Sequence, residues 1–268
     1  MENKSTSIAV LLDSYSVQEW QKQSLERLMS NENLNVKIDL VMINEQSTNP
    51  THFSQLKSLI FGFSLFKLII LWGRLYTFIY SPPWYQETTP ISELDIFNDA
   101  EKYFCKPKPT NGLGNKLPED AIEALSRSDI GVRFGFGILK GEALTAPQYG
   151  VLSYHHGDLT KYRGRPAGFY EFLQDESTAG VTVQRLNETL DGGEIAAMTE
   201  VDISTAKSWG EVKLRLFDCS TDLLWQAIYR CKYEPEQVNN PRKTGKLYTK
   251  PSNKQMIVYL IKRYKNIR

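Results

Sequence analysis

The sequence predicts an α/β protein with a mostly parallel central sheet flanked by helices and a short helical extension at its C-terminus. Three observations lead to this prediction. Short apolar runs of strand length alternate along the chain with longer segments of helical periodicity, as in parallel βαβ units. The chain opens with one such unit. Its 268 residues are enough for one large α/β domain with a sizeable core.

The opening unit comprises two strands and the helix between them. Residues 7–12 (SIAVLL) are typical of a buried parallel strand, residues 17–29 have amphipathic helical spacing, and residues 36–43 predict a second strand. The connection after the first strand, residues 13–16, contains no glycine. Loops that cradle phosphates at this position need glycines for close backbone approach. We therefore expect no nucleotide or sugar phosphate to be held there.

Residues 58–80 form a strongly apolar segment that is interrupted by Lys67 and Arg74. A membrane-spanning helix needs about 20 nearly uncharged residues, and the uncharged runs here are less than half that length. The segment therefore favours one or two buried helices within an apolar helical insertion over residues 56–81. The alternative is a surface helix that docks on a membrane or a protein partner, with both basic residues at its polar edge.

Strands and helices continue to alternate through the rest of the chain. The expected elements are a helix over 119–126, a glycine-interrupted strand over 129–139, a strand over 150–154, a helix over 165–174, a strand over 180–185, a turn over 189–196 that leads into another strand, and one long helix over 207–232. A loop then leads into a short basic helix at the end. This order predicts one α/β domain over residues 1–233 and a C-terminal extension over 234–268.

Composition limits the partners and the location. The net charge of +1 gives no sign of a nucleic-acid surface, and 41% hydrophobic with 24% charged residues is ordinary for a soluble globular protein. The three cysteines form no CxxC pair, and the start of the chain lacks the features of a signal peptide. These features together predict a cytoplasmic protein.

His155 and His156 stand at the carboxyl end of the expected strand over 150–154. Ligands bind at this edge of open α/β sheets, so His155 is a candidate general acid or base. Asp191, in a tight Asp-Gly-Gly turn, is a candidate partner that would fix the imidazole tautomer. Asp158 is the competing partner, although an aspartate there also favours an Asx turn. The alternative interpretation of His155 is a structural histidine that caps the loop or satisfies a buried carbonyl group.

A metal centre is a second chemical interpretation of this loop. His155, His156 and Asp158 are possible ligands, but adjacent side chains on extended backbone point apart, and no HExxH spacing occurs. The sequence therefore predicts no metal site. Lys161 and Arg163 follow in a basic run, where they either orient an anionic substrate or lie in a solvated loop.

The order of these pieces resembles the signature region of the 10-formyltetrahydrofolate-dependent formyltransferases. That family includes the sugar N-formyltransferases, methionyl-tRNA formyltransferase, glycinamide ribonucleotide formyltransferase and formyltetrahydrofolate hydrolase. Gly164 ends a KYRG-like turn, residues 180–182 form the Gly-Val-Thr strand, and residues 190–193 close the pattern as Leu-Asp-Gly-Gly. The resemblance extends over residues 129–197 and implies a Rossmann-like formyltransferase fold.

The resemblance also implies roles for single residues. His155 matches the catalytic histidine of the family, and Asp191 matches the catalytic aspartate. Ser153 stands where the family has an asparagine that holds the formyl oxygen, so the chain is a divergent member, and His156 is a second candidate for that donor. The segment over 129–139 looks like the strand that contacts the folate. The residues expected to bind 10-formyltetrahydrofolate are Phe134, Gly135, Phe136, Gly137, Ile138, Leu139 and Asp158.

We therefore expect a formyltransferase that transfers a formyl group from 10-formyltetrahydrofolate to a small amine, with an amino sugar as one candidate. Glycinamide ribonucleotide is disfavoured because the first connection lacks glycine. A tRNA acceptor is disfavoured because the chain after the long helix is too short for a tRNA-binding barrel and the overall charge is near neutral. Two alternatives stay open: a formyltetrahydrofolate hydrolase on the same scaffold, and a binding protein that keeps the fold without turnover.

Overall fold

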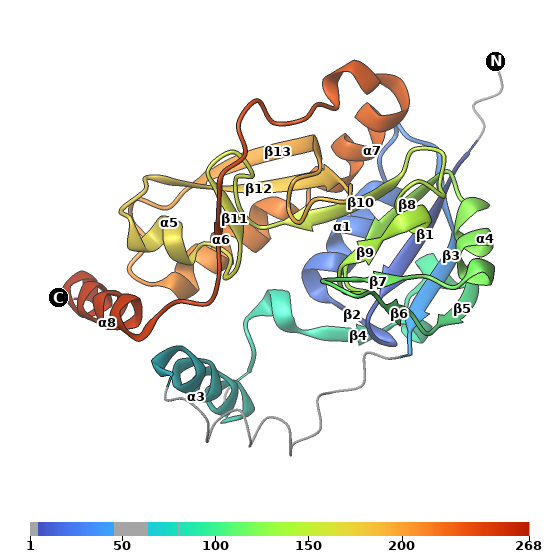
Figure 1. Cartoon of the computed structure of the whole chain (residues 1–268). Coiled ribbons are helices and arrows are strands. Elements are labelled where there is room, and N and C mark those ends of the chain that lie inside the picture. The colour runs from blue at the N-terminus through green and yellow to red at the C-terminus, as the bar shows by residue number, and fades with distance from the viewer. Residues whose placement is uncertain (1–4, 46–63, 80, 268) are drawn as a thin grey trace.

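A computed structural model describes residues 5–45, 64–79 and 81–267, and a seven-stranded sheet forms its centre (Figure 1). The strands run in the order β13-β12-β10-β8-β1-β3-β5. Their bounds are β1 Thr6–Leu12, β3 Val36–Asn44, β5 Glu101–Cys105, β8 Ile130–Arg133, β10 Val151–His155, β12 Thr178–Arg185 and β13 Glu194–Asp202. The five strands from β10 to β5 are parallel, and β12 and β13 add two antiparallel pairings. The expected mostly parallel sheet is therefore confirmed.

The apolar run of β1 reflects burial on both faces of the sheet. Ile8, Val10 and Leu12 pack into one core layer, whereas Ala9 and Leu11 pack into the other. Successive side chains on a strand point to opposite faces, so a strand covered on both sides shows no polar alternation.

Helices cover both faces of this sheet (Figure 1). Their bounds are α1 Glu19–Met29, α4 Glu119–Ser126, α5 Phe169–Leu173, α6 Trp209–Ser220 and α7 Leu223–Tyr233. Apolar side chains of α1, α6 and α7 belong to the larger core cluster, and Ala121, Ala124 and Leu125 of α4 belong to the smaller one. The two clusters therefore lie on opposite sides of the sheet.

The expectation of one long helix over 207–232 is wrong, because the chain breaks between α6 and α7. Ser220 Oγ donates to the carbonyl of Phe217 at 2.8 Å, and Thr221 Oγ1 donates to the carbonyl of Asp218 at 3.0 Å. Hydroxyl side chains that bond back to earlier carbonyls compete with the helical ladder at this point.

The helix expected over 165–174 is also shorter than predicted, since α5 begins only at Phe169. Gly168 precedes it with a φ of +67°, in the left-handed region that no residue of a right-handed helix adopts. An added Cβ there would lie 2.6 Å from Val212 Cγ1, so the close packing of α6 also calls for glycine.

Short strands pair with one another in small sheets that are separate from the main sheet. They are β2 Ser16–Gln18, paired with β4 Thr88–Pro90; β6 Lys108–Pro109, β7 Asn115–Lys116 and β9 Leu139–Lys140, which form one small sheet; and β11 Tyr162–Gly164, paired in parallel with β14 Lys246–Tyr248. Single 3₁₀ turns lie at Trp84–Gln86, Ile91–Glu93, Asp95–Phe97, Gly141–Leu144 and Pro235–Gln237. The pairing of β14 with β11 returns the C-terminal extension to the domain.

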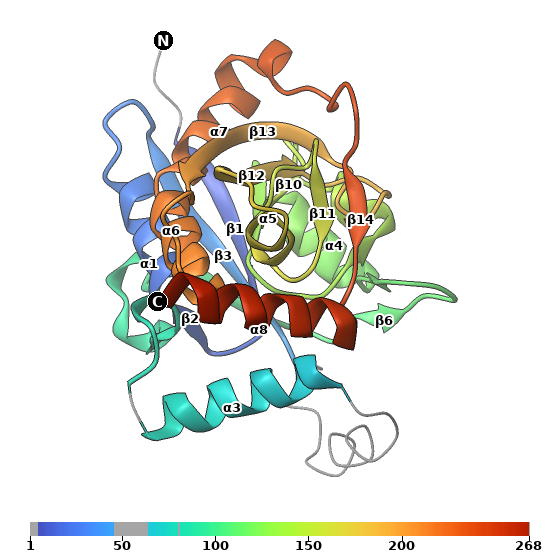
Figure 2. The same cartoon turned by 90° about the vertical axis from the view of Figure 1, so that its left-hand side faces the viewer.

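Two further helices, α3 Leu65–Ile79 and α8 Asn253–Ile267, lie together at one edge of the molecule (Figure 2). The expectation that residues 58–80 form buried helices is wrong for α3, although 58–63 and 80 lie outside the described residues. Five apolar side chains of α3 are 43–70% exposed: Leu68, Leu71, Trp72, Leu75 and Ile79. The cause is geometric, because a helix on the surface of a domain presents only one face to the core and its other apolar residues stay exposed.

In the described ranges no helix is both long enough and apolar enough to cross a membrane.

Candidate active site

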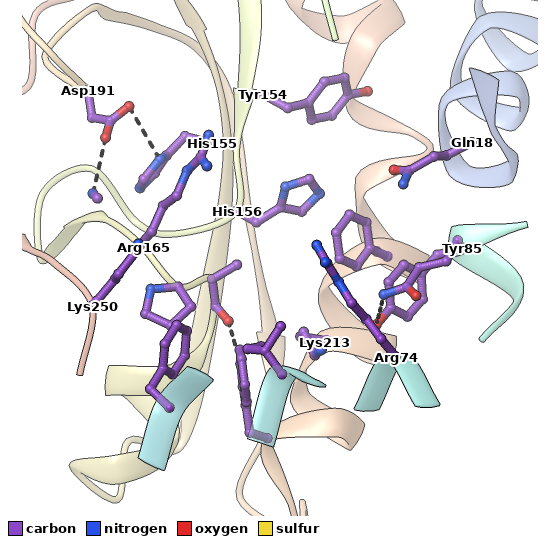
Figure 3. Close-up of a pocket in the computed structure, with 18 of the residues that line it drawn as sticks. Gln18, Arg74, Tyr85, Tyr154, His155, His156, Arg165, Asp191, Lys213 and Lys250 are labelled. Atoms are coloured by element: carbon purple, nitrogen blue, oxygen red, sulfur yellow. Dashed lines mark hydrogen bonds and ion pairs between the residues drawn. The ribbon is translucent and has the colours of Figure 1, made fainter. Parts of the chain in front are cut away.

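The candidate site lies where the parallel part of the sheet meets its antiparallel part. There β8 ends at Arg133 and β10 ends at His155. A cavity of about 820 Å³ opens at these carboxyl ends and reaches across to α3 and α6 (Figure 3). This is the edge at which ligands bind in open α/β sheets, as the sequence predicted.

The structure brings His155 and Asp191 together on one wall of this cavity. Nδ1 of His155 lies 3.7 Å from Oδ1 of Asp191, and its Nε2 lies 2.9 Å from the carbonyl oxygen of Tyr162. The carbonyl oxygen of Tyr162 can only accept, so Nε2 carries the proton of that hydrogen bond, and Nδ1 faces the carboxylate of Asp191 at ion-pair distance. The side chain is only 8% exposed, which holds this geometry away from bulk water.

Asp191 is fixed by the turn that carries it. Its own φ is +45°, and its Oδ2 accepts a hydrogen bond from the backbone of Gly164 at 3.1 Å. Behind it, Asn187 Nδ2 donates to the carbonyl of Gly192 at 2.8 Å. An added Cβ on Gly193 would lie 2.2 Å from the carbonyl oxygen of Arg185. The Asp-Gly-Gly sequence is thus needed for a tight turn that aims one carboxylate at His155.

The loop that follows His155 also needs a glycine, at position 157. An added Cβ at this position would lie 2.7 Å from His155 Nε2 and 2.9 Å from the carbonyl oxygen of Tyr162. A larger side chain would therefore push apart the two groups that share the hydrogen bond.

Asp158, the competing partner, is engaged within its own loop. Its Oδ1 accepts from the backbone and the hydroxyl of Thr160 at 2.8 and 2.6 Å, the Asx-type arrangement expected as the alternative. Lys161 pairs with Glu200 at 3.3 Å, and Nε of Arg163 donates to the carbonyl of Gly245 at 2.8 Å. The predicted roles of Asp158 in cofactor binding and of the two basic residues in substrate binding stay predictions.

Ser153 lies beside the site, in a smaller adjacent cavity of about 210 Å³. Its Oγ accepts from Nη2 of Arg133 at 2.9 Å and donates to the carbonyl of Arg133 at 3.2 Å. Its single proton is therefore already in use. Donation by Ser153 to a formyl oxygen would need a rearrangement, and that role stays a prediction.

Arg133 is the residue that the sequence reasoning missed. Its side chain lines both cavities, and it also donates to the carbonyl of Gly137. Burial lowers the pKa of its guanidinium, while Asp191 and Asp13 act in the opposite direction, and an arginine keeps its proton in proteins. Nε is buried without a partner in the described part of the chain. The signal that could have found it is a single charged residue at the end of an otherwise apolar strand.

His156 lines the same large cavity as His155 but faces another environment (Figure 3). Its ring packs 5.0 Å from Trp20 and 4.2 Å from Phe217, measured between ring centroids. Burial, with a contribution from the charge on His155, lowers its pKa to about 3, so the ring is neutral near pH 7. Its Nε2 has no partner among the described residues. A role as hydrogen-bond donor stays a prediction.

The predicted cofactor segment forms a wall of the smaller cavity. Phe134, Gly135 and Gly137 line it, whereas the side chains of Phe136 and Leu139 are buried in the core. The segment therefore offers backbone, rather than these two side chains, to a ligand. Ile138 does not line either of the two cavities.

Asp13 holds this segment in place. It accepts a hydrogen bond from the backbone of Phe136, and an added Cβ on Gly135 would lie 2.5 Å from its carboxylate. Thus the glycine-free connection after β1 supports the predicted cofactor loop. Within the described ranges, no group of three or more potential metal ligands occurs.

The large cavity is strongly cationic. Of the described residues that line it, one is acidic, Asp191, and six are Lys or Arg: Lys67, Arg74, Arg133, Arg165, Lys213 and Lys250. These six residues come from five separate parts of the chain, so no local sequence motif predicts that they line one cavity. The arrangement favours an anionic ligand.

Comparison with known proteins supports the fold and the family. Residues 114–228 match the family model described as formyl transferase. A methionyl-tRNA formyltransferase from Fusobacterium nucleatum is 27% identical over 168 residues, which cover 62% of this chain and 52% of that protein. The chain thus spans about half the length of the curated relatives it matches.

Solved structures share the fold. A sugar N-formyltransferase from Shewanella sp. superposes with a TM-score of 0.54 at 11% identity, covering 96% of this chain and 87% of that one. An N-formyltransferase from Helicobacter canadensis, in complex with folinic acid and dTDP-3-aminofucose, has a TM-score of 0.51 at 10% identity, covering 91% and 70%. The region that matches the formyl transferase model, residues 114–228, contains both His155 and Asp191, so the part of the chain that resembles this family includes the paired histidine and aspartate of the candidate site.

Proposed function

We propose that this chain transfers a formyl group from 10-formyltetrahydrofolate to a small amine that carries an anionic group. One observation carries the proposal: the paired His155 and Asp191 open into a cavity whose other charged lining residues are all Lys or Arg. The match of residues 114–228 to the formyl transferase model supports the reaction type.

The reaction needs one proton to move. The lone pair of the neutral amine forms a bond to the formyl carbon, and the carbonyl electrons move onto the formyl oxygen. When the tetrahedral intermediate collapses, the bond from carbon to N10 of the folate breaks. The amine nitrogen has then lost a proton and N10 has gained one. His155 is placed to relay this proton, because Asp191 stabilises its cationic form.

Arg133 is our candidate for the donor that stabilises the developing oxyanion. It occupies the position beside Ser153, where the asparagine of the family would reach toward the formyl oxygen. A guanidinium is longer than a serine and carries a full charge. A fixed donor of this kind is worth about 10²–10³ in rate.

The smaller cavity is our candidate for the reactive end of the folate. Phe134, Gly135 and Gly137 line it, and it shares Arg133 and His156 with the large cavity. A folate held there would have its formyl group at the junction of the two cavities. The folinic acid named for the Helicobacter canadensis structure supports a folate donor.

The large cavity is our candidate for the acceptor site. Its Lys and Arg side chains suit a phosphate or diphosphate group on the acceptor. An amino sugar attached to a nucleoside diphosphate combines this charge with a primary amine, and dTDP-3-aminofucose in the Helicobacter canadensis structure is such a molecule. We therefore propose a nucleotide-linked amino sugar as the acceptor class.

The test is release of tetrahydrofolate from 10-formyltetrahydrofolate by the purified chain. Reactions would contain a nucleotide-linked amino sugar, the same sugar without the nucleotide, glycinamide ribonucleotide, methionyl-tRNA, or no amine. We expect release that requires the nucleotide-linked sugar and falls at least 10²-fold in His155→Ala. Folate binding measured by calorimetry would show that this variant still folds and binds the donor.

Other outcomes separate the remaining functions. Release without any amine, lost in His155→Ala, would replace the transferase with a hydrolase. Release that requires methionyl-tRNA or glycinamide ribonucleotide would overturn the acceptor class. Folate binding without release would leave a binding protein, and the absence of folate binding would overturn the proposal entirely.

A further inference from the structure

Helices α3 and α8 present two neighbouring apolar stripes to solvent. On α3, Leu68, Trp72, Leu75 and Ile79 follow spacings of four, three and four residues, so they share one face of the helix. On α8, Ile257, Ile261 and Tyr264 follow spacings of four and three and are 49–57% exposed. We call these seven side chains the α3–α8 surface.

Each helix is anchored to the protein by its opposite face. Phe66, Ile69 and Ile70 of α3 pack against the core, as do the buried Met256 and Tyr259 of α8. The stripes are therefore exposed even though both helices pack against the domain. Both helices have a fixed inner face and an apolar outer face.

The two helices are joined at their N-terminal ends. Oδ1 of Asn253, the first residue of α8, accepts a hydrogen bond from the backbone of Leu65 at 2.9 Å, at the start of α3. Figure 2 shows the helices running alongside one another at the same edge of the molecule. Two distant parts of the chain are thus brought side by side at this edge.

The charge of these helices is of one sign. Neither contains Asp or Glu, and together they carry six basic residues: Lys67, Arg74, Lys254, Lys262, Arg263 and Lys265. The whole chain, by contrast, has a net charge of only +1. Lys262 pairs with Asp175 at 2.6 Å, so its charge is balanced within the protein. A second copy of the chain would place the same cationic helices against each other, which opposes self-association through this surface.

The basic residues beside the outer stripe are Lys254 and Lys265 of α8, which lie three residues before Ile257 and four after Ile261, whereas Lys67 and Arg74 of α3 line the large cavity. An apolar outer face with such basic neighbours matches the boundary between the headgroups and acyl chains of an anionic bilayer. A hollow of about 560 Å³ on α8, lined by Leu260, Ile261, Tyr264 and Lys265, has the same combination of apolar walls and a basic side chain. We propose that the α3–α8 surface docks on an anionic lipid bilayer, with both helices lying in the interface. Trp72, which is 70% exposed, is the aromatic side chain of α3 that enters it.

The test is cosedimentation of the full chain with two kinds of vesicle, one of pure phosphatidylcholine and one of equal parts phosphatidylcholine and phosphatidylglycerol. We expect binding to the anionic vesicles that is at least tenfold tighter than to the neutral ones and weakens with added salt. The emission of Trp72 should shift to shorter wavelength on binding. Trp72→Phe should abolish most of this shift while retaining binding.

The decisive variant is the double substitution Leu75→Glu with Ile261→Glu, which places one carboxylate in each stripe. We expect it to lose at least tenfold in affinity for anionic vesicles. The matched control is Leu113→Glu together with Met198→Glu, which adds the same charge at exposed apolar residues outside both helices and should bind as the wild type does. Circular dichroism of each variant shows whether the fold is retained.

Three results would overturn the proposal. The first is equal binding of neutral and anionic vesicles, which would mean that the surface does not recognise the charge of the bilayer. The second is unchanged vesicle binding by the Leu75→Glu and Ile261→Glu variant. The third is a wild-type dimer in sedimentation velocity that this variant converts to a monomer, which would assign the surface to a second copy. None of these measurements requires turnover, so they stand apart from the proposed function.

Discussion

The two walls of the large cavity are built in different ways. On the strand wall, Asp191 and Ser153 are each held by hydrogen bonds to residues at least 20 positions away in the chain. On the helix wall, α3 contributes Phe66, Ile70 and Leu71, and its opposite face remains exposed. The strand wall is fixed by hydrogen bonds within the site, whereas α3 is held by apolar contacts on one side and by a hydrogen bond at its first residue.

The difference indicates which wall belongs to the reaction and which belongs to this particular chain. The family match over residues 114–228 includes the strand wall and does not reach α3 at Leu65–Ile79. Proton transfer needs fixed distances, whereas the surface that receives an acceptor can vary between relatives. We therefore expect substitutions on the strand wall to change turnover, and substitutions on the acceptor side to change acceptor affinity.

The largest effect should follow Asp191→Asn. The amide keeps the size of the side chain but removes the charge that faces Nδ1 of His155. We expect the rate of formyl transfer at saturating substrates to fall about 10²–10⁴-fold, because the histidine loses the partner that stabilises its cation. Asp99→Asn, at an exposed position, is the matched control. Wild-type turnover by Asp191→Asn would mean that His155 acts without this carboxylate.

Arg133→Gln should give the next largest loss. We expect about a 10²–10³-fold fall in turnover, the range typical of a lost oxyanion donor, with partial recovery in Arg133→Lys. A double-mutant cycle with Ser153→Ala would show whether the two residues act as a unit. If Arg133→Gln changed only the affinity for folate and not the turnover, Arg133 would be a residue that positions the donor.

The sequence was sufficient to predict most of the strand wall. The apolar runs located β1, β3, β10 and β12 to within a few residues, because strands buried on both faces have few alternatives. Asp191 was found because an aspartate followed by two glycines after a strand predicts a tight turn. The pairing of Arg133 with Ser153 could not be found this way, since it depends on which strands lie side by side in the sheet.

The helix wall could not be predicted for a different reason. Residues 65–79 are apolar except for Lys67 and Arg74, and this pattern does not tell whether the basic edge faces solvent or, as in the structure, a cavity. The inner face of α3 depends on segments far along the chain, because Phe66 lies beside Trp209 of α6 and the backbone of Leu65 donates to Asn253 of α8. The convergence of Lys213, Lys250 and Arg165 on the cavity likewise arises only from the packing of distant segments.

Glu171 tests how the strand wall responds to pH. It lies on α5, behind His155 and Tyr162, and burial raises the pKa of its carboxyl from 4.5 to about 7, with the charges of Glu176 and Asp158 adding to the effect. Between these pH values the folded state holds a proton that the unfolded state has lost. The free energy of unfolding should therefore fall as the pH rises from about 5 to 8.

Glu171→Gln should remove this dependence. Relative to the wild type, we expect the variant to gain about 2–3 kcal/mol in free energy of unfolding between pH 5 and pH 8, an order-of-magnitude value from the size of the pKa shift. Urea denaturation at both pH values measures it. A difference between the two proteins that did not change with pH would mean that the carboxyl is charged in the folded state throughout this range.

Lys213→Met should have the smallest effect, and it tests the acceptor side of the comparison. Lys213 lies on α6 with its Nζ 4.4 Å from the ring centre of Trp209, and burial lowers the pKa of its ammonium group. We expect the KM for an anionic acceptor to rise about tenfold, equivalent to about 1.4 kcal/mol, with little change in turnover at saturation. Lys207→Met, at an exposed position before α6, is the control.

The KM for an uncharged amine should not rise in Lys213→Met, because this acceptor has no charge for Lys213 to bind. An equal rise in KM for the charged and the uncharged acceptor would mean that Lys213 acts through the shape of the cavity and not through its charge. In that case the strand wall and the acceptor side could not be assigned to turnover and to acceptor charge, respectively.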